Sequence, residues 1–188
     1  MNTSFNNQSF LGQYISKGNV KTNNRFFPNK RVSIVELKPS DSRDIETLDD
    51  IKKDWRWSDF STAILVDAET VNRHPEDAEL FNFYVVTTQK KNFEKVDPKK
   101  VLAQAEISKD ELSDNRVWIE YLQVRPDCKF GLPNRPYKRV GATFLDFCKE
   151  QFKGKKLLVC SLDDVVNFYK DAGFIQNNRG VGTMFYQA

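Results

Sequence analysis

The chain has 188 residues, of which 39% are hydrophobic and 29% are charged, and its formal net charge is +3. This length fits one domain with a sizeable core, and the composition is typical of a globular protein rather than a disordered one. No window approaches 18 consecutive apolar residues, which argues against a transmembrane helix. A net charge of +3 is too small to indicate nucleic-acid binding by itself.

Residues 1–30 are rich in Asn and Ser and are predicted to form an arm outside a domain of residues 31–188. Runs of β-branched and aromatic residues predict strands, and apolar residues at helical spacing predict helices. In chain order, we predict a strand at 31–37, helices at 42–55 and 59–73, strands at 80–89, 101–108 and 117–125, a helix at 140–152, a strand at 156–162, a helix at 165–172 and a strand at 184–187. This order predicts an α+β domain of the α/β type, with a mixed central sheet flanked by helices.

The cysteines and the single histidine argue against several kinds of site. Cys128, Cys148 and Cys160 cannot all pair, and they lack metal-ligand spacing. With His74 as the only histidine, a zinc site or a serine–histidine triad has little support, and we predict no metal. The N-terminus shows no basic start followed by an apolar run, so we predict no secretory signal. We expect reduced thiols in a cytoplasmic protein, with Cys148 and Cys160 in the core.

Charge is distributed unevenly along the chain. Residues 41–80 contain 12 acidic and 5 basic residues, a net of −7, whereas residues 125–156 contain 9 basic and 3 acidic residues, a net of +6. The two segments are either ligand-binding regions, one for a cation and one for an anion, or ordinary solvated helix faces. The basic segment lacks interleaved aromatic residues for base stacking, so a nucleic-acid partner is not expected.

Two motifs lie on the predicted elements between residues 117 and 174. The first is IEYLQVRPD at 119–127 followed by YKRVGATFLDF at 137–147, and the second is SLDDVVNFYKDAGF at 161–174. Together they resemble the GNAT superfamily of acyl-CoA-dependent N-acyltransferases. The first is similar to the family's fourth strand and pyrophosphate loop, and the second to its helix with a Phe-Tyr…Gly-Phe signature. The resemblance covers residues 31–188 and implies the GNAT fold, with splayed fourth and fifth strands, and acetyl transfer from acetyl-CoA to a primary amine.

The resemblance also implies an acetyl-CoA site. Free backbone groups of the splayed strand would bind the pantetheine arm, and amides at the following helix N-terminus would bind the pyrophosphate. Arg139 stands where the family has glycine, and it either contacts phosphate or crowds the loop. Gly141 leaves room for phosphate to approach the backbone. The implied acetyl-CoA-binding residues are Leu122, Gln123, Val124, Lys138, Arg139, Val140, Gly141, Ala142 and Thr143.

For catalysis, the resemblance implies direct attack of a neutral amine on the thioester. Glu120, predicted to share a strand face with Leu122, is implied as the base; the alternative is a glutamate paired with a neighbouring strand. Tyr169 is implied as the acid that protonates the departing thiolate; the alternative is an aromatic residue at the core edge. The asparagine that the family often carries before this tyrosine is replaced here by Leu162 and Asp163.

Trp55 and Trp57 occupy the part of the chain where the family's acceptor pocket is usually lined. Aromatic rings beside carboxylates can bind a cationic amine, although such tryptophans also anchor helices. With the acidic segment, they suggest a polyamine, an amine-bearing antibiotic or a protein amine as the acceptor. The alternative function is a GNAT-like coenzyme A-binding or interaction module. The apolar residues of the arm are compatible with a homodimer, and no membrane partner is expected.

Overall fold

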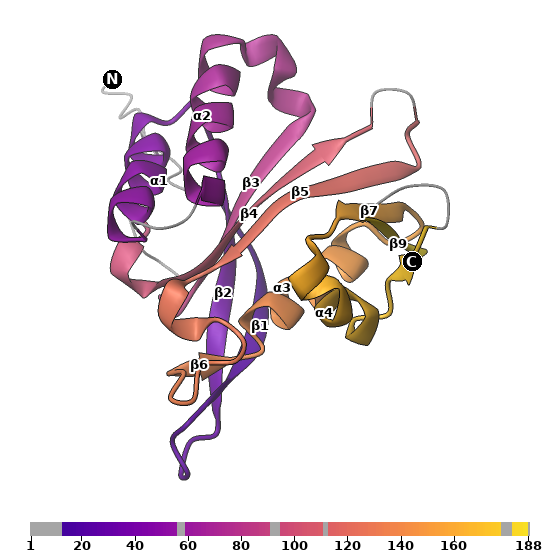
Figure 1. Ribbon diagram of the computed structural model, residues 1–188. Coiled ribbons are helices and arrows are strands. Elements are labelled where there is room, and N and C mark those ends of the chain that lie inside the picture. The colour runs from indigo at the N-terminus through magenta and orange to yellow at the C-terminus, as the bar shows by residue number, and fades with distance from the viewer. Residues whose placement is uncertain (1–12, 56–58, 91–94, 111–112, 178–181, 188) are drawn as a thin grey trace, which may run out of the picture.

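The computed structural model describes residues 13–55, 59–90, 95–110, 113–177 and 182–187. These residues form a nine-stranded mixed sheet in the order β6-β1-β2-β3-β4-β5-β7-β9-β8 (Figure 1). Only β5 and β7 pair in parallel. The strands are β1 (Gln13–Thr22), β2 (Asn29–Leu37), β3 (Phe81–Thr87), β4 (Val101–Lys109), β5 (Arg116–Val124), β6 (Tyr137–Lys138), β7 (Lys156–Cys160), β8 (Ile175–Gln176) and β9 (Thr183–Gln187).

Helices cover both faces of this sheet. One face carries α1 (Ser42–Asp54) and α2 (Asp59–Arg73), and the other carries α3 (Val140–Gln151) and α4 (Val166–Asp171) (Figure 1). This architecture confirms the predicted fold class, and each predicted element is present with bounds that differ by at most two residues. Among the described residues, no helix is long and apolar enough to cross a membrane. The short 3-10 helices are η1 (Pro75–Glu79), η2 (Pro98–Lys100), η3 (Pro126–Cys128) and η4 (Asp163–Val165).

Local signals in the sequence account for the ends of these helices. The Asp41 side chain accepts a hydrogen bond from the Arg43 amide at 3.0 Å, which caps the first turn of α1. Gly173 has a φ of 86° and donates its amide to the Lys170 carbonyl at 2.8 Å, which ends α4. The start of α1 and the end of α4 therefore follow residue type, whereas α3 and α4 begin at Arg139 and Val165 without a side-chain cap.

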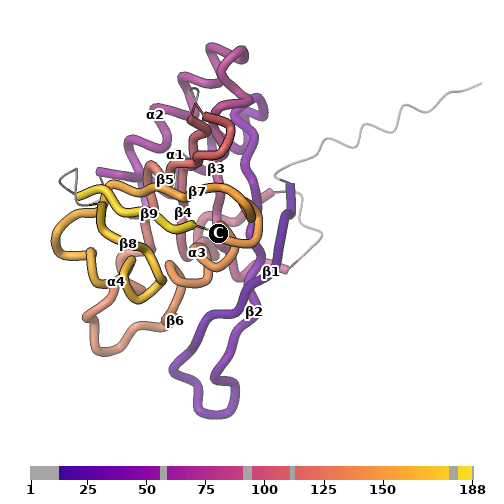
Figure 2. Tube along the Cα trace, turned by 90° about the vertical axis from the view of Figure 1, so that its right-hand side faces the viewer, coloured from indigo at the N-terminus to yellow at the C-terminus, as the bar shows by residue number. Residues whose placement is uncertain are grey.

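The first strand corrects the predicted N-terminal arm. Residues 13–22 form β1, which pairs antiparallel with β2 from Gln13 opposite Glu36 to Lys21 opposite Asn29. The second half of the expected arm is thus part of the sheet, whereas residues 1–12 lie outside the described residues. The β1–β2 hairpin extends beyond the rest of the sheet (Figure 2).

The cysteines differ in their environments. Cys128 and Cys148 are buried free thiols, and burial raises the pKa of the Cys128 thiol to about 11. Cys160 is exposed at the last position of β7, so the prediction of a core residue is wrong there. The apolar run in the sequence continues to Leu162, whereas the strand ends at Cys160, so the run extends past the buried part of β7.

Candidate active site

Strands β5 and β7 correspond to the fourth and fifth strands that the resemblance implied, and they separate along their length. They pair only from Arg116 opposite Lys156 to Ile119 opposite Val159. Residues 120–124 continue β5 beside β4 alone, so their other edge carries no strand partner within the described part of the chain (Figure 1). This confirms the predicted splay, and the unpaired edge includes Leu122, Gln123 and Val124. One group on it is already engaged, because the Gln123 side chain donates to the Val124 carbonyl at 2.8 Å.

The N-terminus of α3 has an unusual backbone. Arg139, its N-cap, has φ 64° and ψ 18°, and it is the one non-glycine residue with positive φ in the described part of the chain. This left-handed conformation costs an L-residue roughly 1–2 kcal/mol and is usual for glycine. Arg139 therefore adopts the backbone conformation that is usual for glycine, the residue expected at this position from the resemblance. The following helical residues give a left-handed to right-handed turn, a backbone geometry whose successive N–H groups are able to bind an anion.

Gly141 brings α3 close to β5 and α4. A Cβ atom at this position would lie 3.0 Å from Cζ of Phe168 and 3.5 Å from Cγ2 of Val124. The space around Gly141 therefore joins the first turn of α3, the end of β5 and the residue that precedes Tyr169. Three parts of the two sequence motifs meet at this point.

Two other residues of the implied cofactor site turn away from β5. The Thr143 hydroxyl donates to the Asn19 carbonyl of β1 at 2.8 Å, and its amide donates to the Arg139 carbonyl at 2.9 Å. Its amide is thus occupied within the helix, which leaves the amides of residues 139–142 for an anion. The Arg139 guanidinium lies 3.8 Å from Asp146, so its side chain does not crowd Gly141. Gly18 allows this contact of β1 with α3, because a Cβ there would overlap the Thr143 methyl group.

Tyr169 lies in the core beneath this region. Its side chain is 7% exposed, and its ring centroid is 5.0 Å from that of Phe168 and 5.6 Å from that of Phe174. Burial raises the pKa of the Tyr169 phenol to about 12. The hydroxyl therefore keeps its proton across the neutral range and can act only as a donor or a neutral acceptor.

Glu120 occupies a β-bulge. Glu106 of β4 pairs with Tyr121 and Ile107 pairs with Ile119, so Glu120 is the extra residue on β5. Its carboxylate accepts a hydrogen bond from Ser108 of β4. The bulge reverses the alternation, and Glu120 lies on the α2 side while Leu122 packs toward the α3 side. The prediction that they share a face is wrong for this reason.

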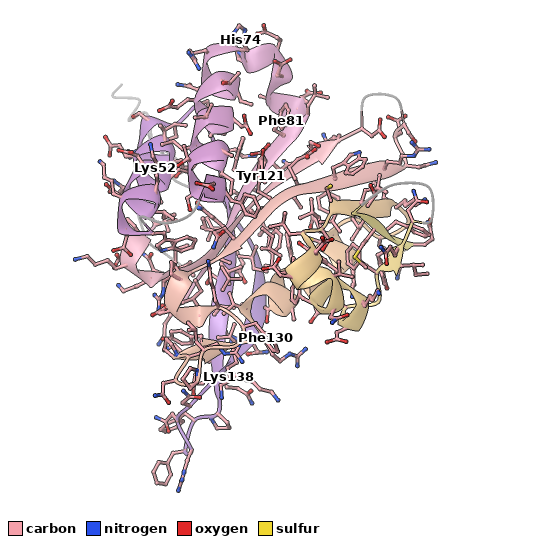
Figure 3. All side chains as sticks on the ribbon, in the orientation of Figure 1. Lys52, His74, Phe81, Tyr121, Phe130 and Lys138 are labelled. Carbon is pink, nitrogen blue, oxygen red and sulfur yellow. The ribbon has the colours of Figure 1, made fainter. Side chains whose placement is uncertain are left out.

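The bulge places Glu120 in a group of acidic side chains that the sequence analysis missed. We call Asp67 of α2, Glu106 and Glu120 the acidic cluster. Tyr121 lies against it between β5 and α2, with its ring centroid 5.4 Å from that of Phe60 (Figure 3). The signal in the sequence was a charged residue within the otherwise buried strand β4. No group of three or more potential metal ligands is found among the described residues.

Glu106 is the buried member of the acidic cluster. It is 1% exposed, it shares a hydrogen bond with Asp67, and its Oε2 atom has no hydrogen-bond partner among the described residues. Burial, together with the charges of Asp67 and Glu120, raises the pKa of Glu106 to about 9. Glu106 is thus protonated at neutral pH, and a carboxyl in this state can donate a proton but cannot accept one.

Trp55 is a core residue rather than an exposed wall of an acceptor pocket. Trp55 is 1% exposed and packs in the core between α1, α2 and the sheet. It lines the floor of a hollow of about 350 Å³ beside Lys99 and Arg125 but offers no open ring face to a ligand. Of the two roles left open, the structure favours anchoring of the helix. Trp57 lies outside the described residues.

Comparison with known proteins supports the fold through structure rather than through sequence. No protein-family model and no curated protein sequence matches the chain. A protein assigned to the GNAT acetyltransferase family from Desulfovibrio desulfuricans superposes with a TM-score of 0.54 at 13% identity, over 84% of this chain and 98% of its own.

Two further solved structures agree. AtaTR bound with acetyl-CoA gives a TM-score of 0.53 at 17% identity, over 83% of this chain and 92% of that one. An acetyltransferase from Thermus thermophilus gives a TM-score of 0.53 at 11% identity, over 82% and 94%. Together with the splayed strands, these similarities show that the chain has the GNAT fold.

Proposed function

We propose that the protein is an N-acetyltransferase that transfers an acetyl group from acetyl-CoA to a primary amine. The observation that carries this proposal is the splay of β5 from β7, with the N-terminus of α3 and the Phe168-Tyr169 helix meeting beside it. A free strand edge, an anion-binding turn and a buried phenol are together what a thioester with a pyrophosphate-bearing arm requires.

The residues present fit acetyl-CoA. The edge formed by Leu122 and Val124, on either side of Gln123, would offer backbone groups to the pantetheine arm, and the amides of residues 139–142 would bind the pyrophosphate. A side chain at Gly141 would press against Phe168 and Val124 beside this turn, since a Cβ atom there would lie 3.0 Å from the Phe168 ring. Lys138 adds a positive charge beside the same turn. When bound, acetyl-CoA supplies the activated acetyl group.

Glu120 would act as the general base and Tyr169 as the general acid. Glu120, at the bulge, takes a proton from the incoming ammonium, so that the nitrogen lone pair is free to attack the thioester carbon. As the C–N bond forms and the C–S bond breaks, Tyr169 donates its phenolic proton to the departing sulfur. The second proton that the nitrogen loses returns to the Tyr169 oxygen through solvent, which leaves the amide, the free thiol and a neutral phenol. Glu106 does not serve as the base at neutral pH because it already holds a proton there.

The acidic cluster supports a cationic acceptor. Asp67 and Glu120 bring negative charge to the α2 side of β5, and the Tyr121 and Phe60 rings lie beside them. Carboxylates next to aromatic rings bind an ammonium group by charge and by cation–π contact. A polyamine, an amine-bearing antibiotic or a protein amine fits this chemistry.

Thermal unfolding with and without acetyl-CoA tests the cofactor site. A ligand that binds only the folded state stabilises it by RT ln(1 + [L]/Kd), about 2.7 kcal/mol at a hundredfold excess over Kd. Gly141→Trp is expected to abolish this stabilisation, whereas Gln151→Trp, at the other end of the same helix, is expected to retain it. Equal stabilisation of all three proteins, each with a native circular dichroism spectrum, would refute the cofactor site.

Acetylation of a panel of amines tests the catalytic assignment. Tyr169→Phe and Glu120→Gln are each expected to lower kcat about 100-fold, the usual contribution of a general acid or base. Stabilisation by acetyl-CoA should persist in both variants. The alternative, a GNAT-like module that binds coenzyme A without turnover, is motivated by the arginine in place of glycine at Arg139. It predicts stabilisation by acetyl-CoA with no acetylation of any amine.

A further inference from the structure

The tip of the β1–β2 hairpin is an ordered turn that exposes two phenylalanines. Thr22, on one side of the turn, binds the other side through two hydrogen bonds. Its amide donates to the Pro28 carbonyl at 2.8 Å, and its hydroxyl donates to the Phe27 carbonyl at 2.7 Å. The Asn24 side chain accepts from the amides of Phe26 and Phe27 at 2.9 and 3.1 Å. Phe26 is 88% exposed and Phe27 72% exposed. The turn therefore holds two large apolar rings in solvent by specific contacts.

A loop from the other half of the chain joins this hairpin. The Asn23 side chain donates to the Arg135 carbonyl at 2.7 Å, and β6 pairs with β1 at Lys21 opposite Lys138. The loop exposes a third ring, Phe130, which is 93% exposed and has the Arg135 guanidinium 5.3 Å from its centroid. Phe130 and Lys138 lie near each other at this end of the molecule (Figure 3).

The same two segments carry only positive charge. Residues 13–31 contain five basic and no acidic residues, and residues 129–138 contain three basic and no acidic residues. None of the eight cations forms an ion pair with another described residue. By the register of β1 with β2, Lys17, Lys21 and Arg31 share one face of the hairpin. We define the basic surface as Lys17, Lys21, Arg25, Lys30, Arg31, Lys129, Arg135 and Lys138 with Phe26, Phe27 and Phe130.

We propose that the basic surface binds single-stranded nucleic acid. Unpaired cations spread along two strands and a loop match a line of phosphates, and exposed rings among them match unstacked bases. A membrane fits less well, because the exposed rings stand among polar residues, including asparagines at positions 19, 23, 24 and 29, rather than in a continuous apolar run. The expectation of no nucleic-acid partner considered residues 125–156 alone and left out Phe130, which lies between Lys129 and Arg135. The fold adds Phe26 and Phe27 from the hairpin.

This surface does not depend on acetyl transfer and can be tested separately. The probe is a fluorescent 20-nucleotide oligouridine, or the corresponding DNA, titrated with the full chain at several salt concentrations. Binding to either single strand should weaken with salt, with a slope of log K against log salt of about −0.7 per phosphate contacted. The variant K17Q/K21Q/R31Q should reduce this slope by about 2 and lower affinity at least tenfold. The variant F26A/F27A should lower affinity about tenfold with little change of slope.

The matched control is K52Q/K53Q on α1, which also removes lysine charge but lies far from Phe130 and Lys138 (Figure 3). It should bind the oligonucleotides as the wild type does. Stabilisation by acetyl-CoA should be unchanged in the hairpin variants, which separates this proposal from the cofactor site. Wild-type affinity in both hairpin variants would overturn the proposal, as would binding only to duplexes or only to vesicles of anionic phospholipid.

Discussion

The acidic cluster and the basic surface use charge in opposite ways. In the acidic cluster, three carboxyl groups are drawn together under α2, and burial keeps a proton on Glu106. On the basic surface, eight cations stay at the solvent boundary and carry no carboxylate partner among the described residues. The difference is one of desolvation, because a buried charge changes its protonation whereas an exposed charge keeps it and is screened.

This contrast indicates two kinds of ligand. A compact site with a shared proton can respond to a single cationic group, because a nearby ammonium restores the ionised form of a carboxyl. An extended array of hydrated cations instead suits a polyanion, whose binding releases counterions. The two regions lie on different parts of the sheet, so each can be altered without the other.

The largest expected effect concerns pH and stability in the acidic cluster. Glu106 has its pKa raised from 4.5 to about 9 in the folded state. Its contribution is complete below pH 4.5 and falls by roughly 1 kcal/mol per pH unit as pH rises toward 9, because only the unfolded chain loses the proton. Glu106→Gln should remove this slope in urea unfolding measured from pH 5 to 9. Lys21→Gln, on the basic surface, should retain it, and parallel curves for wild type and Glu106→Gln would contradict the assignment.

Trp55, a core residue within the acidic segment 41–80, is expected to contribute to stability rather than to binding. Trp55→Ala should lower the free energy of unfolding by about 3–5 kcal/mol, the usual cost of a deleted core aromatic. Trp55→Phe should cost clearly less, because the buried Nε1 atom has no hydrogen-bond partner among the described residues. The KM for the amine should not change in Trp55→Phe. A raised KM with unchanged stability would instead place Trp55 at the acceptor.

The smallest effect lies beside the basic surface, at Arg139. Arg139→Gly should raise the free energy of unfolding by about 1 kcal/mol, because glycine accepts the left-handed backbone. The lost ion pair with Asp146 should matter little, since both side chains are exposed and 3.8 Å apart. The matched control is Lys138→Gly in β6, which should lower stability. If Arg139→Gly also lowered it, the surface charge would contribute more than the backbone strain.

Several parts of the fold and site could be predicted from the sequence because their signals are local. Asp41 caps α1 and Gly173 ends α4 where their residue types indicated. The two motifs that suggested the splayed strands do meet, around Gly141 and Phe168. Each of these inferences needed only a short window of residues, since caps, turns and helix starts are decided by neighbours in the chain.

The parts that were missed depend on contacts between distant segments. β1 was predicted as an arm because its sequence is polar, and its partner β2 alone defines it as a strand. The bulge at Glu120 is invisible in one strand, because an extra residue exists only relative to the register of β4. Glu106 likewise appeared as one charge in an apolar run until Asp67 and Glu120 were placed beside it.

Local signals were therefore enough to predict the order of the helices and of the long strands from β2 onward, and the uneven distribution of charge. Only the tertiary structure decided that Glu120 faces α2, that Trp55 is core, and that the hairpin phenylalanines join the basic loop through Asn23 and Arg135. The physical reason is that periodicity and capping are properties of one segment. Strand register and burial instead depend on pairs of segments that are far apart in the chain.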